Sequence, residues 1–468
     1  MKSHLRPALT AALFASLAMG CAIPAFAQSA FVAPDNTYSG RVSVSATERG
    51  APVVPGTAVT ISGRDFKPGQ EVVLKRGETL LNADGPFKAD AEGQFSGSYT
   101  IPADAIPGLH PVIVTVTNPS FAEVIEVKVS PDIPVSGSDK FEMTSARVGH
   151  GLYQVAYSAA SKALFVTSAV GRPPVAQSEL FKLDPETLEI LARTTPADAP
   201  KADDGRPGGV FAVYGVGVDD SRGTVWVTNT RQNTVAVYNQ ADLSLVKQFA
   251  PGTATHARDV VIDEKAGKVY VSATTTPNIV VIDAETLAVE SMIEVPSSKR
   301  RTETSVGSLQ LDTTTGKLVT VSLSSDEAAI IDTAKGEVEK VFALPGAAGA
   351  IGVGYDGTDN LVFVASQRSD NLLIVDAASG DVLHDVKVGA GPLNLEYEPK
   401  SGLVFVATRG SGTVGVIDKE GNLVANLDAG TYPNHLIAAE DGRIFMVNKS
   451  AGEDDPEGDR ITRITPAH

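Results

Sequence analysis

Basic side chains recur in loops of a repeating β pattern that begins near residue 141. Such loops share one face if the repeats are arranged around a common axis, so a chain of formal net charge −17 would carry one electropositive face. Forked guanidinium groups there could bind phosphate, carboxylate or an acidic peptide. The alternative is that loops are polar and arginine is common in them. The basic loop residues are Arg172, Arg206, Arg231, Arg258, Lys299, Arg300, Arg301, Arg368, Arg409 and Lys449.

A second set of polar residues stands at the start of the first strand of each repeat. These aligned positions are Gln154, Gly215, Asp259, Ser308, Gly352, Asn394 and His435. Polar groups that converge on the mouth of a channel fit a site for a small ligand or a peptide. A polar, water-filled channel lining is the alternative. Tyr153, Tyr214 and Arg258 stand one position before aligned residues. Members of both sets, together with the two tyrosines, are therefore the predicted ligand-binding residues: Tyr153, Gln154, Tyr214, Arg231, Arg258, Asp259, Arg368, Asn394, Arg409 and His435.

Catalytic and metal sites are not indicated. His150, His256 and His435 lie in different repeats and lack the spacing of zinc ligands. The acidic loop "GEDDPEGDR" lacks the alternating aspartates of a calcium loop. The sequence contains no G-x-S-x-G elbow, no Gly-Lys-Ser/Thr phosphate loop and no cysteine nucleophile. We therefore expect no catalytic residue, no metal and no cofactor.

The elements that must position these residues repeat along the chain. "LVFVASQRSDNLLIVD" (Leu361–Asp376) returns as "LVFVATRGSGTVGVID" (Leu403–Asp418) 42 positions later. A period near 45 residues indicates a propeller or a solenoid, and seven second strands of the type "LVFVA" can be counted. The third strands close on residues expected to cap turns rather than to bind metal, namely Asp184, Asn239, Asp283, Asp332, Asp376 and Asp418.

Ring closure is predicted from the last repeat, which ends after "RITRITP" without a fourth strand. An open strand edge invites aggregation. "KFEMTSARVG" (Lys140–Gly149) precedes the first complete repeat, so we expect it to supply the outer strand of the seventh blade.

The first 140 residues contain three further segments. Lys2 and Arg6, an apolar run and Ala25-Phe26-Ala27 predict a signal peptide over residues 1–27, hence a periplasmic or secreted protein. Cleavage after Ala27 would remove the single cysteine, Cys21; lipidation at Cys21 is the alternative. Short alternating strands over residues 28–130 predict a β-sandwich, and residues 131–140 a linker. No later apolar run approaches the roughly 20 residues of a membrane-spanning helix, so we expect no membrane insertion.

Two family resemblances follow from these residues. Val227-Thr228-Asn229, the repeated "VID" endings, "VGAGPLNLEY" and the export signal resemble the YncE-type, or YVTN-repeat, seven-bladed β-propellers over residues 141–468. "VTISGRDFKPGQEVVL" resembles the immunoglobulin-like modules of bacterial exported proteins. The expected fold is therefore all-β, a seven-bladed propeller behind an immunoglobulin-like sandwich. The resemblance implies the fold more than the function, because seven-bladed propellers have unrelated activities.

Three functional hypotheses remain open. The first is an exported, non-enzymatic recognition protein whose basic face binds an anionic small molecule, an acidic peptide or an envelope protein. The second is binding of single-stranded DNA, a ligand class that the YncE resemblance allows, although loss of Lys2 and Arg6 would take the net charge from −17 to −19 and oppose it. The third is a lactonase-like hydrolase, for which Arg258, Asp259 and His435 are the candidates.

Overall fold

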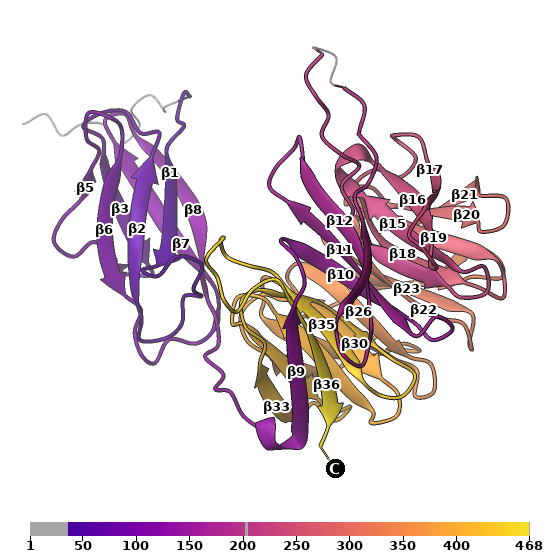
Figure 1. Cartoon of the computed structure of the whole chain (residues 1–468). Coiled ribbons are helices and arrows are strands. Elements are labelled where there is room, and N and C mark those ends of the chain that lie inside the picture. The colour runs from indigo at the N-terminus through magenta and orange to yellow at the C-terminus, as the bar shows by residue number, and fades with distance from the viewer. Residues whose placement is uncertain (1–35, 202–204, 468) are drawn as a thin grey trace, which may run out of the picture.

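The computed structural model describes residues 36–201 and 205–467, so the predicted signal peptide and Cys21 lie outside the described residues. The described chain is all-β apart from two short 3-10 helices, η1 (Ser138–Lys140) and η2 (Thr230–Gln232). Figure 1 shows a smaller group of strands beside a larger ring of sheets.

Residues 36–130 form two antiparallel sheets, which we call the N-terminal module. One sheet has the order β1 (Arg41–Ala46), β2 (Ala58–Arg64), β6 (Phe95–Thr100). The other has the order β4 (Thr79–Leu80), β3 (Glu71–Arg76), β7 (Gly108–Thr117), β8 (Phe121–Val129), with β5 (Phe87–Lys88) also paired to β3. Alternate residues of both sheets, such as Ile61 and Leu74, are buried in one shared core, as the alternating sequence predicts.

From residue 152 the chain folds into consecutive four-stranded antiparallel sheets, six of which are built from strands adjacent in sequence. The first is β10 (Leu152–Ser158), β11 (Ala163–Val170), β12 (Gln177–Leu183), β13 (Ile190–Thr194); the second is β14 (Val216–Asp219), β15 (Thr224–Asn229), β16 (Thr234–Asn239), β17 (Leu245–Gln248); the third is β18 (Ala257–Asp263), β19 (Lys268–Ala273), β20 (Asn278–Asp283), β21 (Ala288–Glu294).

The next three sheets repeat this order. They are β22 (Val306–Asp312), β23 (Lys317–Ser322), β24 (Glu327–Asp332), β25 (Glu337–Ala343); β26 (Ala350–Asp356), β27 (Leu361–Ser366), β28 (Asn371–Asp376), β29 (Val382–Lys387); and β30 (Pro392–Glu398), β31 (Leu403–Thr408), β32 (Thr413–Ile417), β33 (Leu423–Asp428).

The last sheet joins the two ends of the ring. It consists of β34 (Pro433–Ala438), β35 (Ile444–Asn448), β36 (Arg460–Pro466) and β9 (Phe141–Arg147). β9 pairs with β36 from Arg147↔Arg460 to Pro466↔Phe141, so the predicted use of this early segment as an outer strand is confirmed (Figure 1). The pairing covers the strand edge that β36 would otherwise expose.

Packing between sheets accounts for the repetition. The first strand of each sheet contacts the first strand of the next, and β34 contacts β10, so the sheets form a closed ring. Apolar clusters combine neighbouring sheets: the fully buried Trp226 on β15 packs with Val269 and Val271 on β19. Since one sheet alone cannot bury both faces, each repeat supplies the apolar surface that its neighbour needs.

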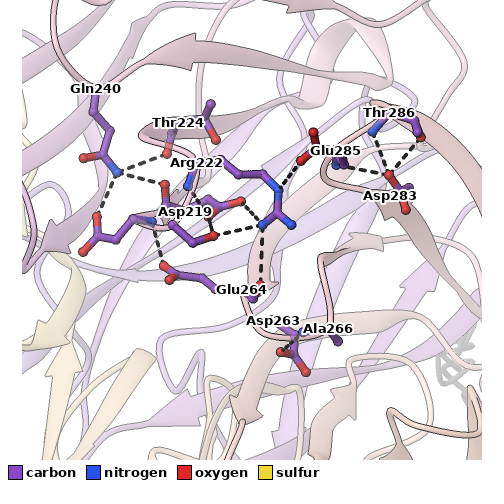
Figure 2. A network of polar contacts seen from close by, with 12 residues as sticks. Asp219, Arg222, Thr224, Gln240, Asp263, Glu264, Ala266, Asp283, Glu285 and Thr286 are labelled. Atoms are coloured by element: carbon purple, nitrogen blue, oxygen red, sulfur yellow. Dashed lines mark hydrogen bonds and ion pairs between the residues drawn. The ribbon is translucent and has the colours of Figure 1, made fainter.

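The residues that close the third strands cap turns. In Figure 2, Asp283 Oδ1 accepts the amides of Glu285 at 3.1 Å and Thr286 at 2.7 Å, which lowers the pKa of Asp283 to about 2. Asp184, Asp332, Asp376 and Asp418 accept turn amides in the same manner, so the capping prediction is confirmed for them. Asn239 differs, because its side-chain amide donates to Ser244 Oγ at 2.7 Å.

The N-terminal module contacts the ring through the outward face of β8. Lys128 Nζ lies 2.6 Å from Oδ1 of Asp370, whose side chain is only 3% exposed, and also donates to the Gln367 carbonyl. Glu126, two residues earlier, pairs with Arg368. The connecting segment adds a β-bridge between Ser136 and Asn426.

We expect Lys128→Ala to lower the free energy of unfolding of the ring by about 1–2 kcal/mol, because it leaves the buried carboxylate of Asp370 without its cation. The effect is below that of a fully buried pair, because Lys128 is 30% exposed. Trp226 is the only tryptophan in the sequence, so its fluorescence during urea denaturation monitors the ring alone. Lys75→Ala, on an outward position of β3, is the control; equal midpoints for the two variants would contradict the prediction.

Candidate anion-binding site at the mouth of the ring

A cavity of about 340 Å³ lies at one end of the ring axis. Its walls come from the starts of first strands and from loops between second and third strands. Six of the ten predicted ligand-binding residues line it: Tyr153, Gln154, Tyr214, Arg231, Arg258 and His435. Asp259 and Asn394 instead line a second cavity of about 230 Å³ further along the axis, which we call the channel.

The aligned polar residues connect neighbouring sheets. Gln154 Oε1 accepts the amide of Val216 at 3.1 Å, and Asp259 Oδ2 accepts that of Leu309 at 3.2 Å. Asn394 Oδ1 likewise accepts the amide of Leu436 at 2.8 Å. These amides belong to the first strand of the following sheet, and satisfying them stabilises the ring.

His435 makes the equivalent contact between the last sheet and the first sheet of the ring. The Val155 amide faces its Nδ1 at 3.5 Å, and burial lowers the pKa of His435 to about 4. Gln154 also donates to Asp259 Oδ1 at 2.7 Å. Since Gln154 and His435 line both cavities, they separate the mouth from the channel. These side chains are already engaged in hydrogen bonds between sheets, which leaves little freedom for acid–base chemistry.

Two tyrosines form an aromatic wall of the mouth. The Tyr153 and Tyr214 rings meet edge to face, with centroids 4.6 Å apart. Lys449 Nζ lies 3.5 Å from the centroid of the Tyr153 ring, a cation–π contact. Burial raises the pKa of both tyrosines, so they stay neutral. With an edge and a cation against them, these rings do not offer two free faces for stacking of bases.

Cations surround this wall with few counter-charges. Arg231 is exposed at the rim. The nearest carboxylate to Arg258 is Asp259, with Nε and Oδ1 3.8 Å apart, and this buried Nε forms no hydrogen bond with the residues that the structure describes. Arg409 donates to Asn434 and lies over the Tyr432 ring. Across residues 36–201 and 205–467, no carboxylate forms an ion pair with Arg231, Arg409 or Lys449.

Burial and nearby cations lower the pKa values of the basic groups around the mouth. Burial and the nearby Arg409 lower the pKa of Lys449 to about 7. Burial, with Arg231 and Arg258 nearby, also lowers the pKa of His256, which lines the mouth. Burial lowers the pKa of Arg409 as well. An anion in the cavity would relieve the repulsion from these cations.

Arg368 is the predicted site residue whose environment differs most from expectation. It matches Arg231 in the repeat, but its guanidinium pairs with Glu126 of the N-terminal module. Arg368 does not line the mouth cavity, and neither does Arg409, which lies behind Asn434. The sequence could not reveal the pairing of Arg368, because Glu126 is 242 positions away in the chain.

Three of the lining residues outside the predicted set have side chains suited to bind a ligand or carry a proton, namely Asn434, His256 and Glu396. Asn434 occupies the position before the aligned His435, just as Tyr153 precedes Gln154, so the alignment contained the signal. His256 lines the mouth, although the sequence alone considered it only as a metal ligand. Glu396 lines the channel two positions after Asn394, on the same side of its strand, and burial raises its pKa to about 8.

Residues 36–201 and 205–467 contain no cluster of three or more His, Cys, Asp or Glu side chains suited to hold a metal ion. Within those ranges there is also no helix of the length and apolarity needed to cross a membrane.

The chain is similar to known proteins in sequence and in structure. The YncE protein of Salmonella typhi is 26% identical over 340 residues, covering 69% of this chain and 90% of that protein. The YncE protein of Escherichia coli K12 is 25% identical over 319 residues, covering 66% and 85%. Virginiamycin B lyase of Staphylococcus aureus superposes with a TM-score of 0.53 at 14% identity, over 70% of this chain and all of the lyase. The ring of this chain is YncE-like.

The YncE-like assignment rests on these pairwise similarities, since no protein family model matches. The predicted β-propeller and its YncE resemblance are thereby supported. Likeness to the lyase shows a shared fold only, because fold does not determine activity.

Proposed function

We propose that this chain is an exported, non-enzymatic recognition protein that binds the carboxylate or phosphate groups of an anionic ligand at the mouth of a seven-bladed YncE-like propeller. In this proposal residues 1–27 are a signal peptide, residues 28–130 an immunoglobulin-like module that acts as a spacer or second docking surface, residues 131–140 a linker and residues 141–468 the propeller. The ligand is an anionic small molecule, an acidic peptide or an acidic segment of an envelope protein.

The observation that carries the proposal is the concentration of cations around one cavity. Arg231, Arg258, Arg409 and Lys449 lie at or just behind its wall, and among the described residues only Arg258 of these four forms an ion pair with a carboxylate, although the charge of Asp459 also acts on Lys449. Within an acidic protein this is an uncompensated charge of one sign in a concave site, which concentrates anions. The tyrosine hydroxyls, Asn434 and neutral His435 supply further polar groups.

The lactonase hypothesis is less well supported. It needs Asp259 or His435 as a mobile general acid or base, yet both are hydrogen-bonded to neighbouring sheets. Asp259 also lines the channel rather than the mouth. Binding of single-stranded DNA retains the basic cavity but lacks free aromatic faces, so it enters the experiment as a competing outcome.

The experiment is fluorescence anisotropy of two labelled probes, a hexaglutamate peptide and a single-stranded oligonucleotide, at low and moderate salt. We expect saturable binding of the peptide that weakens with salt. Tighter binding of the oligonucleotide at both salt concentrations would make nucleic acid the ligand class. Absence of binding of both probes at low salt would overturn the proposal.

Affinity for the peptide should fall about three- to tenfold between pH 6 and pH 8, because the pKa of Lys449 is about 7. A bound anion favours the protonated amine, so it raises this pKa and binding takes up protons near neutral pH. Calorimetry in two buffers of different ionisation enthalpy measures that uptake. The Lys449→Met variant should show a flat profile in this range, since the pKa of His256 lies below its usual 6.5. A flat profile for the wild type would contradict the role of Lys449.

A further inference from the structure

A third cavity, separate from the mouth and the channel, lies inside the N-terminal module. It measures about 270 Å³ and is bounded by both sheets, including Val59 and Ile61 of β2, Val112 of β7 and Val129 of β8. These four side chains are at most 3% exposed. The volume is close to the lower end of the about 300–1,000 Å³ typical of small-molecule sites. Ordinary packing of a sandwich core leaves few voids larger than one water molecule, so this space is a distinct feature.

The end of this cavity is polar because two strands carry basic residue types, an arginine and a histidine, at inward-facing positions. On β3, Val72 and Leu74 face the core, and the alternation of the strand directs Arg76 to the same side. On β7, Val112 and Val114 are buried, and His110 continues their series. Arg76 and His110 both line the cavity. A charged residue at an inward position of a strand breaks the apolar pattern, and a solvent-exposed guanidinium there can take a carboxylate partner.

Arg76 has no such partner in the part of the chain that the structure describes: it forms no ion pair and no side-chain hydrogen bond. His110 uses one ring nitrogen to reach the Ile106 carbonyl at 2.8 Å, which holds its ring at the rim. Arg76, Thr79 and Pro102 are exposed whereas Val59, Ile61, Val112 and Val129 are buried, so the cavity opens to solvent at the end that holds Arg76.

We infer that the N-terminal module binds a small hydrophobic carboxylate, with its hydrocarbon part between the two sheets and its carboxylate beside Arg76. The buried aliphatic walls favour a hydrocarbon chain because they offer water no hydrogen bonds. The guanidinium provides the charge-assisted contact that selects an acid over a neutral molecule of equal length. The wall strand β8 also carries Glu126 and Lys128 on its opposite face, so the site is connected to the contact with the ring.

The experiment is isothermal titration of the purified full chain with octanoate, with octan-1-ol as the neutral ligand of equal length and acetate as the acid without a chain. We expect octanoate to bind at one site, octanol more weakly and acetate not at this site. Arg76→Gln should weaken octanoate binding by about tenfold, since hydrogen bonds to a charged group are the stronger kind. Lys75→Gln removes a charge from the neighbouring, outward position and should leave octanoate binding unchanged.

A second variant, Ala105→Phe, tests the cavity itself by placing a phenyl group in its lining at a partly exposed position. It should abolish octanoate binding while the thermal unfolding of the ring, followed at Trp226, stays unchanged. Octanoate is an anion and could also bind at the mouth of the ring. The Arg231→Gln variant removes a cation of the mouth, so any loss of binding heat in this variant identifies octanoate bound there. Absence of octanoate binding, or binding that Arg231→Gln removes but Arg76→Gln and Ala105→Phe leave intact, would overturn the inference.

Discussion

Replacing Arg231, Arg258 and Lys449 together with alanine is expected to weaken binding of the hexaglutamate probe by about 100-fold or more, since each charge-assisted contact contributes about 1.5–3 kcal/mol. Arg231 and Arg258 line the mouth from two sheets, and Lys449 lies behind its wall against the Tyr153 ring, so their loss removes charge from several directions. The slope of affinity against salt should also become shallower. Anisotropy titration at two salt concentrations measures both effects.

The matched control places the same charge change at the opposite end of the sheets. Lys265, Lys335 and Lys400 are exposed and stand in turns that do not line the mouth. The triple alanine variant at these positions has the same net charge as the mouth variant, so a general electrostatic effect would weaken both equally. Equal affinities for the two variants would contradict an anion site at the mouth.

Asp259→Ala is expected to lower the free energy of unfolding of the ring by about 2–4 kcal/mol, because buried donors lose a charged acceptor. The carboxylate accepts bonds from Gln154 Nε2 at 2.7 Å and from the Leu309 amide at 3.2 Å, and the residue is 6% exposed. Urea denaturation followed at Trp226 measures the change. Asp381→Ala, at an exposed position of the ring, should stay within about 0.5 kcal/mol of wild type.

This second prediction separates a structural role from a catalytic one. If Asp259→Ala unfolds at the wild-type urea concentration, then Asp259 does not connect the third and fourth sheets as described, and the lactonase hypothesis regains a free carboxylate.

Much of the ring could be predicted because its information is local and repeated. The 42-residue spacing between Leu361 and Leu403 fixes which strands are equivalent, and the missing fourth strand of the last repeat pointed to β9. The alignment of equivalent strands also placed Tyr153, Tyr214 and Arg258 at the mouth, since aligned positions in a closed ring converge on its axis.

The partners of these residues could not be predicted in the same way. Gln154 and Asp259 accept backbone amides of the following sheet beside irregularities in strand register, and an alignment of repeats contains no signal for such a shift. Arg368 is equivalent to Arg231 by position, yet the N-terminal module supplies a carboxylate to one and not to the other. The cavity within the N-terminal module depends on the spacing between its two sheets. The alternation of residues along a strand predicts which side chains face inward but not that spacing.

The most direct test of the anion site is a crystal structure of the protein soaked in selenate, located by the anomalous scattering of selenium. The proposal predicts a peak inside the 340 Å³ cavity, in contact with Arg231 or Arg258, and its loss in crystals of the Arg231, Arg258, Lys449 triple alanine variant. Selenate bound only at surface lysines, with an empty mouth, would contradict the central claim.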